Sequence, residues 1–198
     1  MKYLKKYLPR QLKRVLRRLV YNLYESFSYR SCQISSKPTY IRHVIFVCKG
    51  NICRSSFAEY YLKSILAINV IKIDSCGLDV DQGFLSPPEA IKVGREFGVE
   101  LGQHFSKGLS SCDFNSANLI VPMEYIQYLR LIELYPQYSY KIRLLRDFAP
   151  WPHRLFCNIY DPYGLGENEF RRCFLSMQRC LAAIKNCYFN HTLTKKNE

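Results

Sequence analysis

The order in which short apolar runs and helical patterns follow one another narrows the fold of this chain more than any other feature. His43–Cys48 is a short run of β-branched and aromatic residues, typical of a strand buried in a parallel sheet. Similar runs lie at 70–73, 118–123 and 142–145. Helical patterns at 54–67, 87–98 and 167–187 are interspersed with them. Strands separated by helices indicate βαβ units, so we expect a three-layer α/β fold with a four-stranded parallel sheet and helices on both faces.

The N-terminal segment differs from the rest of the chain in charge. The net charge is +13, of which residues 1–42 contribute +10, from eleven Lys/Arg against the single acid Glu25. Residues 43–198 contribute only +3, from eighteen Lys/Arg and fifteen acids. A basic arm on a nearly neutral body argues against nucleic acid as a partner, because no basic surface extends over the body.

Residues 10–28 have the pattern of a basic amphipathic helix. Its apolar side chains follow helical spacing: Leu12, Val15, Leu16, Leu19, Val20, Leu23 and Phe27. We expect this helix and a linker to form residues 1–41, a globular domain to span 42–190, and a polar tail to occupy 191–198. Residues 1–28 would suit an anionic membrane surface or the groove of a partner protein. The alternatives are that the apolar stripe packs on the domain itself, or that this Arg-rich, acid-poor start is an organelle transit peptide.

The cysteines and the missing motifs limit the chemistry. Nine cysteines, an odd number in no repeating framework, are typical of a reducing compartment, so we expect the cytoplasm, with residues 1–28 able to hold the protein at the inner membrane face. No apolar run approaches the ~20 residues of a membrane span. No CxxC pair or zinc-like His/Cys spacing occurs, and neither G-x-G-x-x-G nor G-K-[ST] is present. We therefore expect no metal and no cofactor.

A loop with the pattern C-x5-R-S follows the first strand, from Cys48 to Ser55. A short loop between a strand and a helix start aims several backbone N–H groups at an anion. Arg54 can hold two phosphate oxygens with its planar guanidinium. The same surroundings favour the thiolate of Cys48, which is the nucleophilic form. The pattern therefore indicates phosphoryl transfer to cysteine; the alternative is a buried strand-end thiol followed by an ordinary turn.

The sequence V-C-x-G-N-I-C-R-S, from Val47 to Ser55, resembles the signature loop of low-molecular-weight protein tyrosine phosphatases. Three further segments resemble the family in the same order: 74–78 after the second strand, 98–106 with His104, and 144–148 followed by Asp161-Pro162-Tyr163-Gly164. The resemblance covers roughly residues 42–187. It implies a flavodoxin-like fold and hydrolysis of phosphotyrosine, or of other aryl phosphate monoesters, through a phosphocysteine intermediate.

The resemblance also implies roles for individual residues. Cys48 would attack phosphorus, Arg54 would stabilise the phosphoryl oxygens, and Asp161 would protonate the leaving phenolate and then activate water. The phosphate-binding loop would comprise Lys49, Gly50, Asn51, Ile52, Cys53, Arg54 and Ser55.

Other residues would support this machinery. Asn51, Ser55 and His104 would brace the loop, and Tyr163 would wall the substrate cleft. Cys53 would form a reversible disulfide with Cys48, although a plain packing residue would look the same in the sequence.

Rival functions exist on the same scaffold. Thiol-coupled arsenate reductases need extra cysteines after the third strand, and residues 123–141 contain none. A loop with Thr at the position of Ile52 would resemble the protein-arginine phosphatases. The bulky aliphatic Ile52 suits a flat phenyl ring better than a guanidino group. A rival of another class, an inactive phosphotyrosine-binding module, is disfavoured because Cys48, Arg54 and Asp161 are all present. Bacterial members of the family often oppose tyrosine autokinases that govern exopolysaccharide export, so the expected partner is a phosphotyrosine protein such as a bacterial tyrosine kinase.

Overall fold

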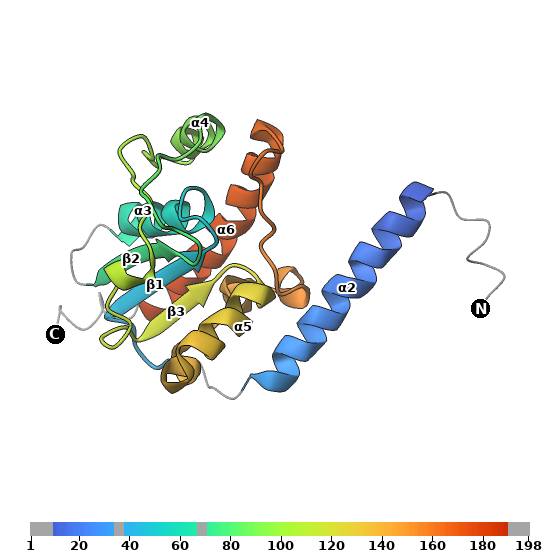
Figure 1. Cartoon of the computed structure of the whole chain (residues 1–198), viewed down its shortest axis with the longest axis horizontal. Helices are drawn as coiled ribbons and strands as arrows, with labels where there is room; N and C mark the ends of the chain where they lie inside the picture. The colour runs from blue at the N-terminus through green and yellow to red at the C-terminus, as the bar shows by residue number, and fades with distance from the viewer. Residues whose placement is uncertain (1–9, 34–37, 67–70, 190–198) are drawn as a thin grey trace.

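The computed structural model describes residues 10–33, 38–66 and 71–189 of the chain (Figure 1). Three parallel strands, β1 (His43–Cys48), β2 (Lys72–Gly77) and β3 (Leu119–Pro122), form a sheet in the order β2-β1-β3. Cys48, the last residue of β1, is in register with Gly77, the last residue of β2. The predicted α/β fold with a parallel sheet is confirmed.

The described helices lie on both faces of this sheet. Their bounds are α2 (Arg10–Cys32), α3 (Arg54–Leu66), α4 (Pro88–Glu96), α5 (Tyr125–Leu134) and α6 (Glu167–Tyr188). Short 3₁₀ helices are η1 (Leu109–Ser111), η2 (Pro136–Lys141), η3 (Leu145–Phe148) and η4 (His153–Leu155).

All six residues of β1 are buried because alternate side chains enter two separate cores. Val44, Phe46 and Cys48 pack with α3, α4 and α6 in one core. Ile45 and Val47 pack in the other, under α5 and Tyr29 of α2. The strand end that bears Cys48 is thereby fixed from both sides.

The predicted fourth strand at 142–145 is wrong. Only Ile142 forms a parallel bridge, to Ile120 of β3, with Arg143 N–H donating to the Ile120 carbonyl at 2.9 Å. Leu144 N–H then donates to the Tyr29 hydroxyl at 3.2 Å, and η3 begins at Leu145. The hydrogen-bond ladder with β3 cannot continue past Arg143, because the backbone N–H of Leu144 is already bonded to Tyr29.

Other boundaries also shifted. The second strand begins at Lys72, later than predicted, and residue 70 lies outside the described residues. Helix α5 had not been predicted, and α2 continues four residues beyond the predicted end into the expected linker. The predicted tail at 191–198 also lies outside the described residues.

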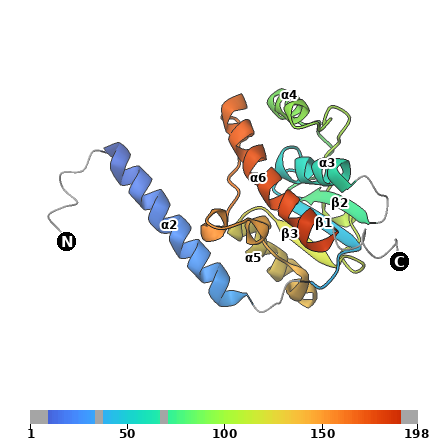
Figure 2. The same ribbon diagram turned by 180° about the vertical axis from the view of Figure 1, so that it is seen from behind.

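The long helix α2 touches the body only with its C-terminal part, and its N-terminal part extends away from it (Figures 1 and 2). No helix among the described residues has the length and apolarity needed to cross a membrane.

Candidate active site

The site begins where β1 ends. The buried Cys48 is followed by the five-residue loop 49–53, and α3 starts at Arg54. The helix holds this loop through Phe57 N–H, which donates to the Cys53 carbonyl at 3.1 Å, and through the Ser56 hydroxyl, which donates to the same carbonyl at 3.1 Å. The first N–H groups of a helix have no acceptor within it, so this junction presents donors to an anion.

The Cys48 sulfur has two polar partners. Ser55 Oγ lies 3.0 Å from Sγ, and Asn51 N–H donates to Sγ at 3.2 Å. Both groups can donate to a thiolate, and donors aimed at the charged form stabilise it. The structure therefore brings Cys48 together with two of the predicted supporting residues.

Asn51 holds the loop in an unusual conformation. Its φ of 51° lies in the left-handed region, which Asn tolerates better than most residues. Its amide donates to Ser55 Oγ at 2.9 Å and to Ser75 Oγ at 2.8 Å, while its Oδ1 accepts from Lys107 N–H at 2.9 Å. His104 Nε2 lies 2.7 Å from the Asn51 carbonyl, and burial lowers the pKa of His104. The three residues predicted to brace the loop, Asn51, Ser55 and His104, therefore lie together around it.

Gly77 allows β2 to approach the loop closely. A Cβ placed on it would lie 2.4 Å from Val80 Cγ2, 2.9 Å from the Lys49 carbonyl oxygen and 3.0 Å from Asn51 N. Any side chain here would therefore push against the loop backbone itself.

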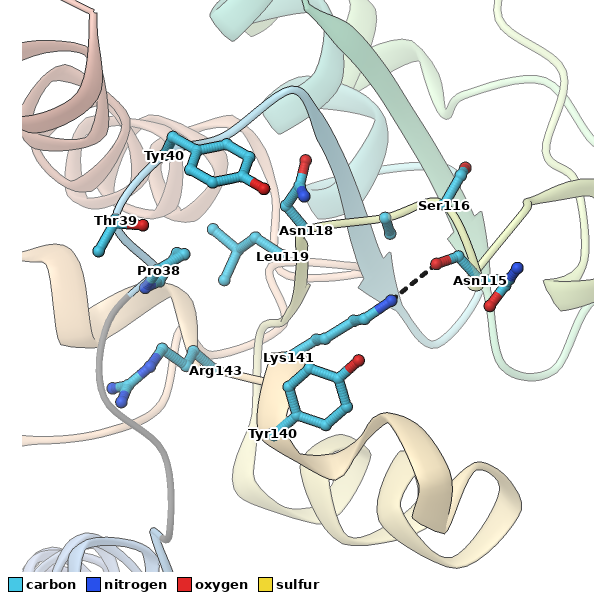
Figure 3. Close-up of a pocket in the computed structure, with 11 residues that line it drawn as sticks. Pro38, Thr39, Tyr40, Asn115, Ser116, Asn118, Leu119, Tyr140, Lys141 and Arg143 are labelled. Carbon is cyan, nitrogen blue, oxygen red and sulfur yellow. Dashed lines mark hydrogen bonds between the residues drawn. The ribbon is translucent and has the colours of Figure 1, made fainter.

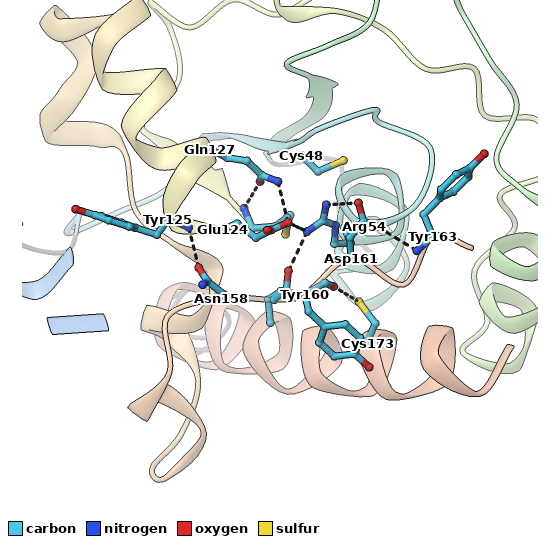
Figure 4. A network of polar contacts seen from close by, with 12 residues as sticks. Cys48, Arg54, Glu124, Tyr125, Gln127, Asn158, Tyr160, Asp161, Tyr163 and Cys173 are labelled. Carbon is cyan, nitrogen blue, oxygen red and sulfur yellow. Dashed lines mark hydrogen bonds and ion pairs between the residues drawn. The ribbon is translucent and has the colours of Figure 1, made fainter. Parts of the chain in front are cut away.

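Arg54 is a buried cation, 1% exposed, held between two carboxylates (Figure 4). Nη1 pairs with Glu124 and donates to the Ile159 carbonyl at 2.9 Å, and Nη2 donates to Asp161 Oδ2 at 2.7 Å. Burial opposes the charge, but Cys48, Glu124 and Asp161 outweigh it and raise the pKa of Arg54. Its buried Nε has no hydrogen-bond partner among the described residues.

Asp161 and Tyr163 belong to the loop that precedes α6. Asp161 Oδ1 accepts the Tyr163 N–H at 3.2 Å, a local bond that fixes the carboxylate beside Arg54. The Tyr163 side chain is 61% exposed. A residue with an apolar ring at the rim of a site can cover a flat substrate ring.

These groups line one pocket of about 240 Å³. Its lining residues are Cys48, Lys49, Gly50, Ile52, Cys53, Arg54, Asp79, Asp161 and Tyr163. Asn51, Ser55 and His104 are buried behind this lining. The three predicted catalytic residues and the cleft tyrosine therefore meet at one cavity, although more than 100 positions separate Cys48 and Arg54 from Asp161 and Tyr163.

A second pocket, of about 480 Å³, lies near the amino ends of β1 and β3 (Figure 3). It contains Tyr40, Asn115, Tyr140 and Lys141, and Lys141 Nζ donates to the Asn115 carbonyl at 2.7 Å. None of the predicted site residues lines it.

Sequence reasoning gave no role to two acids that the fold places at the site. Glu124 pairs with Arg54, and buried Glu59 accepts from Ser75 Oγ at 2.5 Å behind Asn51. The signal for Glu124 was available, because it directly follows a strand end. Glu59 lies within a helix, where nothing in the local pattern marks it as buried.

Comparisons with known proteins agree with this geometry. Residues 43–197 match the family described as low molecular weight phosphotyrosine protein phosphatase. The chain is 31% identical over 137 residues to the low molecular weight protein-tyrosine-phosphatase Wzb of Escherichia coli K12, covering 69% of this chain and 88% of that protein. It is 29% identical over 124 residues to the protein-arginine-phosphatase of Bacillus subtilis, covering 61% and 79%.

A solved structure supports the same assignment. The crystal structure of the Erwinia amylovora tyrosine phosphatase amsI superimposes with a TM-score of 0.68 at 26% identity, covering 76% of this chain and 95% of that one. Family match, fold and site geometry lead to one conclusion: the chain belongs to the low molecular weight phosphotyrosine protein phosphatase family.

Proposed function

We propose that this enzyme hydrolyses phosphotyrosine in proteins through a phosphocysteine intermediate formed on Cys48. The observation that carries the proposal is the buried Nε of Arg54, which has no acceptor among the described residues and belongs to the same pocket as the Cys48 thiol. A buried donor without a partner is costly, and a phosphate oxygen would satisfy it. Nε and Nη2 form one edge of the guanidinium, so a phosphate can accept from both.

The reaction follows from the positions of three side chains. The Cys48 thiolate attacks phosphorus, forming an S–P bond while the bond from phosphorus to the phenolic oxygen breaks. Arg54 stabilises the phosphoryl oxygens, and Asp161 gives its proton to the departing phenolate. Asp161 then accepts a proton from water, which attacks phosphorus, breaks the S–P bond and releases inorganic phosphate. One carboxyl group can serve as acid and then as base because the two steps reverse its protonation state.

Two pocket residues support tyrosine over arginine as the substrate side chain. Ile52 presents an aliphatic side chain to the pocket, and Tyr163 offers a ring at its rim. Both surfaces suit a phenyl ring, whereas a guanidino group would lose hydrogen-bond partners there. A bacterial tyrosine kinase remains the proposed partner, and Asp161→Ala protein used as a trap for phosphoproteins would identify it.

The nucleophile is tested by Cys48→Ser. We expect the variant to lose aryl phosphatase activity, because a serine hydroxyl here has no base to deprotonate it. Binding of inorganic phosphate should persist through Arg54 and the loop, which separates loss of chemistry from loss of fold. Turnover within tenfold of the parent enzyme would remove Cys48 from the mechanism; binding without turnover in the parent enzyme would instead favour a phosphotyrosine-binding module.

The acid is tested by Asp161→Asn on two substrates. The nitrophenolate of p-nitrophenyl phosphate leaves without a proton, whereas the phenolate of phenyl phosphate needs one. We expect kcat/KM, which reports the steps up to departure of the phenol, to fall by ~10²–10⁴-fold for phenyl phosphate and far less for p-nitrophenyl phosphate. Equal losses would mean that Asp161 is not the proton donor.

We also propose that residues 1–28 bind an anionic membrane surface, beside a phosphatase domain at 42–190. Leu16, Val20 and Phe27, on the predicted apolar stripe, are 42%, 65% and 73% exposed, so this part of the stripe does not pack on the body. Arg17 and Arg18 are exposed on the same helix. A helix binds a membrane surface when its apolar side chains are buried in the interface and its basic side chains attract anionic lipid headgroups.

Co-sedimentation with liposomes of graded anionic content tests this surface. We expect the full chain to bind increasingly with anionic lipid and less with added salt. A double variant, Val20→Asp with Phe27→Asp, should abolish binding, while the control Leu175→Asp, at an exposed position of α6, should not. If the double variant binds as the parent does, or if neither binds, the membrane proposal is lost.

A further inference from the structure

Helix α2 docks on the body through a face other than its apolar stripe. Glu25, Ser26 and Tyr29 are 8%, 3% and 1% exposed, and their spacing of three and four residues puts them on one side of the helix. Residues 10–32 of this helix all precede residue 43, where the family match begins. The contacts below are therefore made by a segment outside the matched family region.

Tyr29 anchors the helix. Its ring packs edge-on against Tyr128 of α5, with centroids 4.9 Å apart. Its hydroxyl donates to Asp147 and accepts from Gln33 Nε2 at 2.6 Å and from Leu144 N–H at 3.2 Å. Burial, and then the charge of Asp147, raise the pKa of Tyr29, so this hydroxyl remains a donor. A fully partnered buried hydroxyl fixes both the depth and the rotation of the helix.

Helix α2 makes two further hydrogen bonds, to adjacent residues of the loop that precedes Asp161. Cys157 N–H donates to Ser26 Oγ at 3.0 Å, and Asn158 Nδ2 donates to Glu25 Oε2 at 2.7 Å. Asn158 Oδ1 in turn accepts the Tyr125 N–H at the start of α5 at 2.7 Å. The helix thus holds both the backbone and a side chain of this loop.

The same loop continues directly into the catalytic groups. Ile159 N–H donates to the Met123 carbonyl at 2.8 Å, and the Ile159 carbonyl accepts from Arg54 at 2.9 Å. Asp161 follows two residues later, against the other nitrogen of Arg54 (Figure 4). Residues 157–161 therefore form one continuous segment. Its first residue, Cys157, is held by Ser26 of α2, and its last, Asp161, is held by Arg54.

We propose that Glu25 and Ser26 of α2 are positioning residues for Asp161, so that a helix outside the family region sets the geometry of the proton donor. This proposal rests on the proposed role of Asp161. Geometry matters because a general acid works only within hydrogen-bond reach of the leaving oxygen, and small displacements are costly. The helix acts through the loop and touches no substrate itself.

The test compares phenyl phosphate with p-nitrophenyl phosphate in full-length variants. In Glu25→Ala and Ser26→Ala we expect kcat/KM for phenyl phosphate to fall about tenfold, a part of the ~10²–10⁴-fold that acid catalysis supplies. For p-nitrophenyl phosphate it should change by less than about twofold, because that leaving group needs no proton. Glu25→Gln retains an oxygen acceptor for Asn158 and should restore activity on phenyl phosphate.

A matched control lies on the same helix. Ser31 donates to the Phe27 carbonyl at 3.0 Å, as Ser26 does to the Asn22 carbonyl at 2.7 Å, but Ser31 is exposed. Ser31→Ala should therefore leave both activities unchanged.

The outcomes separate the two proposals. A variant that merely unfolds loses both activities in proportion, and the ratio of the two kcat/KM values stays at the parent value. If Asp161→Asn changes that ratio while Glu25→Ala and Ser26→Ala do not, the positioning role is wrong and the acid assignment stands. If Asp161→Asn leaves the ratio unchanged, the acid assignment itself fails.

Discussion

Asp161 Oδ2 accepts a hydrogen bond from Arg54 Nη2 at 2.7 Å, so the proposed acid occupies a donor that a bound phosphate would use. The neighbouring Nε on the same edge is without a partner among the described residues. A phosphate bound at this edge therefore competes with the carboxylate for Arg54 and lies beside the negative charge of Asp161.

This competition predicts that Asp161→Ala binds inorganic phosphate more tightly than the parent enzyme. We expect roughly a tenfold lower dissociation constant by titration calorimetry, since a hydrogen bond to a charged group is worth about 1.5–3 kcal/mol. Asp79→Ala is the control, because Asp79 lines the same pocket but pairs with Arg130 at 2.7 Å. Equal tightening in both variants would attribute the effect to net charge alone.

Glu124→Ala should destabilise the protein and reduce turnover. The variant leaves buried Arg54 with one carboxylate partner fewer, and Glu124 itself is 27% exposed. We expect a loss of about 2 kcal/mol in the free energy of unfolding, less than the ~3–5 kcal/mol for a fully buried pair. Urea unfolding measures the loss, and an unchanged midpoint would show that Ile159 and Asp161 suffice to hold Arg54.

Mild peroxide should inactivate the enzyme reversibly. Oxidation of Cys48 to the sulfenic acid, followed by attack of the Cys53 thiol and release of water, would give a disulfide. Burial, and then the charge of Cys48, raise the pKa of Cys53, so Cys53 is not the thiol that peroxide oxidises first.

The disulfide is tested with dithiothreitol. Cys53→Ser should retain activity before oxidation but recover much less after it, whereas Cys187→Ser, at an exposed position of α6, should recover fully. Identical recovery of Cys53→Ser and the parent would discard the disulfide.

His104 should make the protein less stable in mild acid. Burial lowers the pKa of folded His104, whereas the unfolded side chain titrates near ~6.5. Below that pH the unfolded state binds more protons, so the contribution is fully present above ~6.5 and is lost as pH falls through the folded pKa. The free energy of unfolding should fall by at most ~1.4 kcal/mol for each pH unit in this range.

The comparison protein is His104→Gln, which can still donate to the Asn51 carbonyl. Its free energy of unfolding should depend less steeply on pH below ~6.5 than that of the parent. His43, whose pKa is also lowered by burial, is present in both proteins and cancels in the difference. Parallel curves would show that His104 does not titrate across the transition.

Local pattern was enough to predict the elements that surround the nucleophile. The β-branched run at 43–48, the helix after it and the C-x5-R-S loop between them are all encoded within a few residues of one another. Periodicity fails for the segment at 142–145, which has the composition of a strand but gives its Leu144 N–H to Tyr29. That acceptor comes from a helix 115 positions earlier, and no window of sequence contains both partners.

The sequence by itself determined the chemistry: a thiol, a guanidinium and a carboxylic acid in a recognisable order, with the loop that presents the first two. Tertiary structure alone decided how they meet. It placed Glu124 against Arg54, put Glu59 behind Asn51, and turned the buried face of α2, rather than its apolar stripe, toward the loop that carries Asp161. The reason is that hydrophobic periodicity reports which side of a helix is apolar, whereas docking here depends on hydrogen-bond partners that the fold supplies from distant segments.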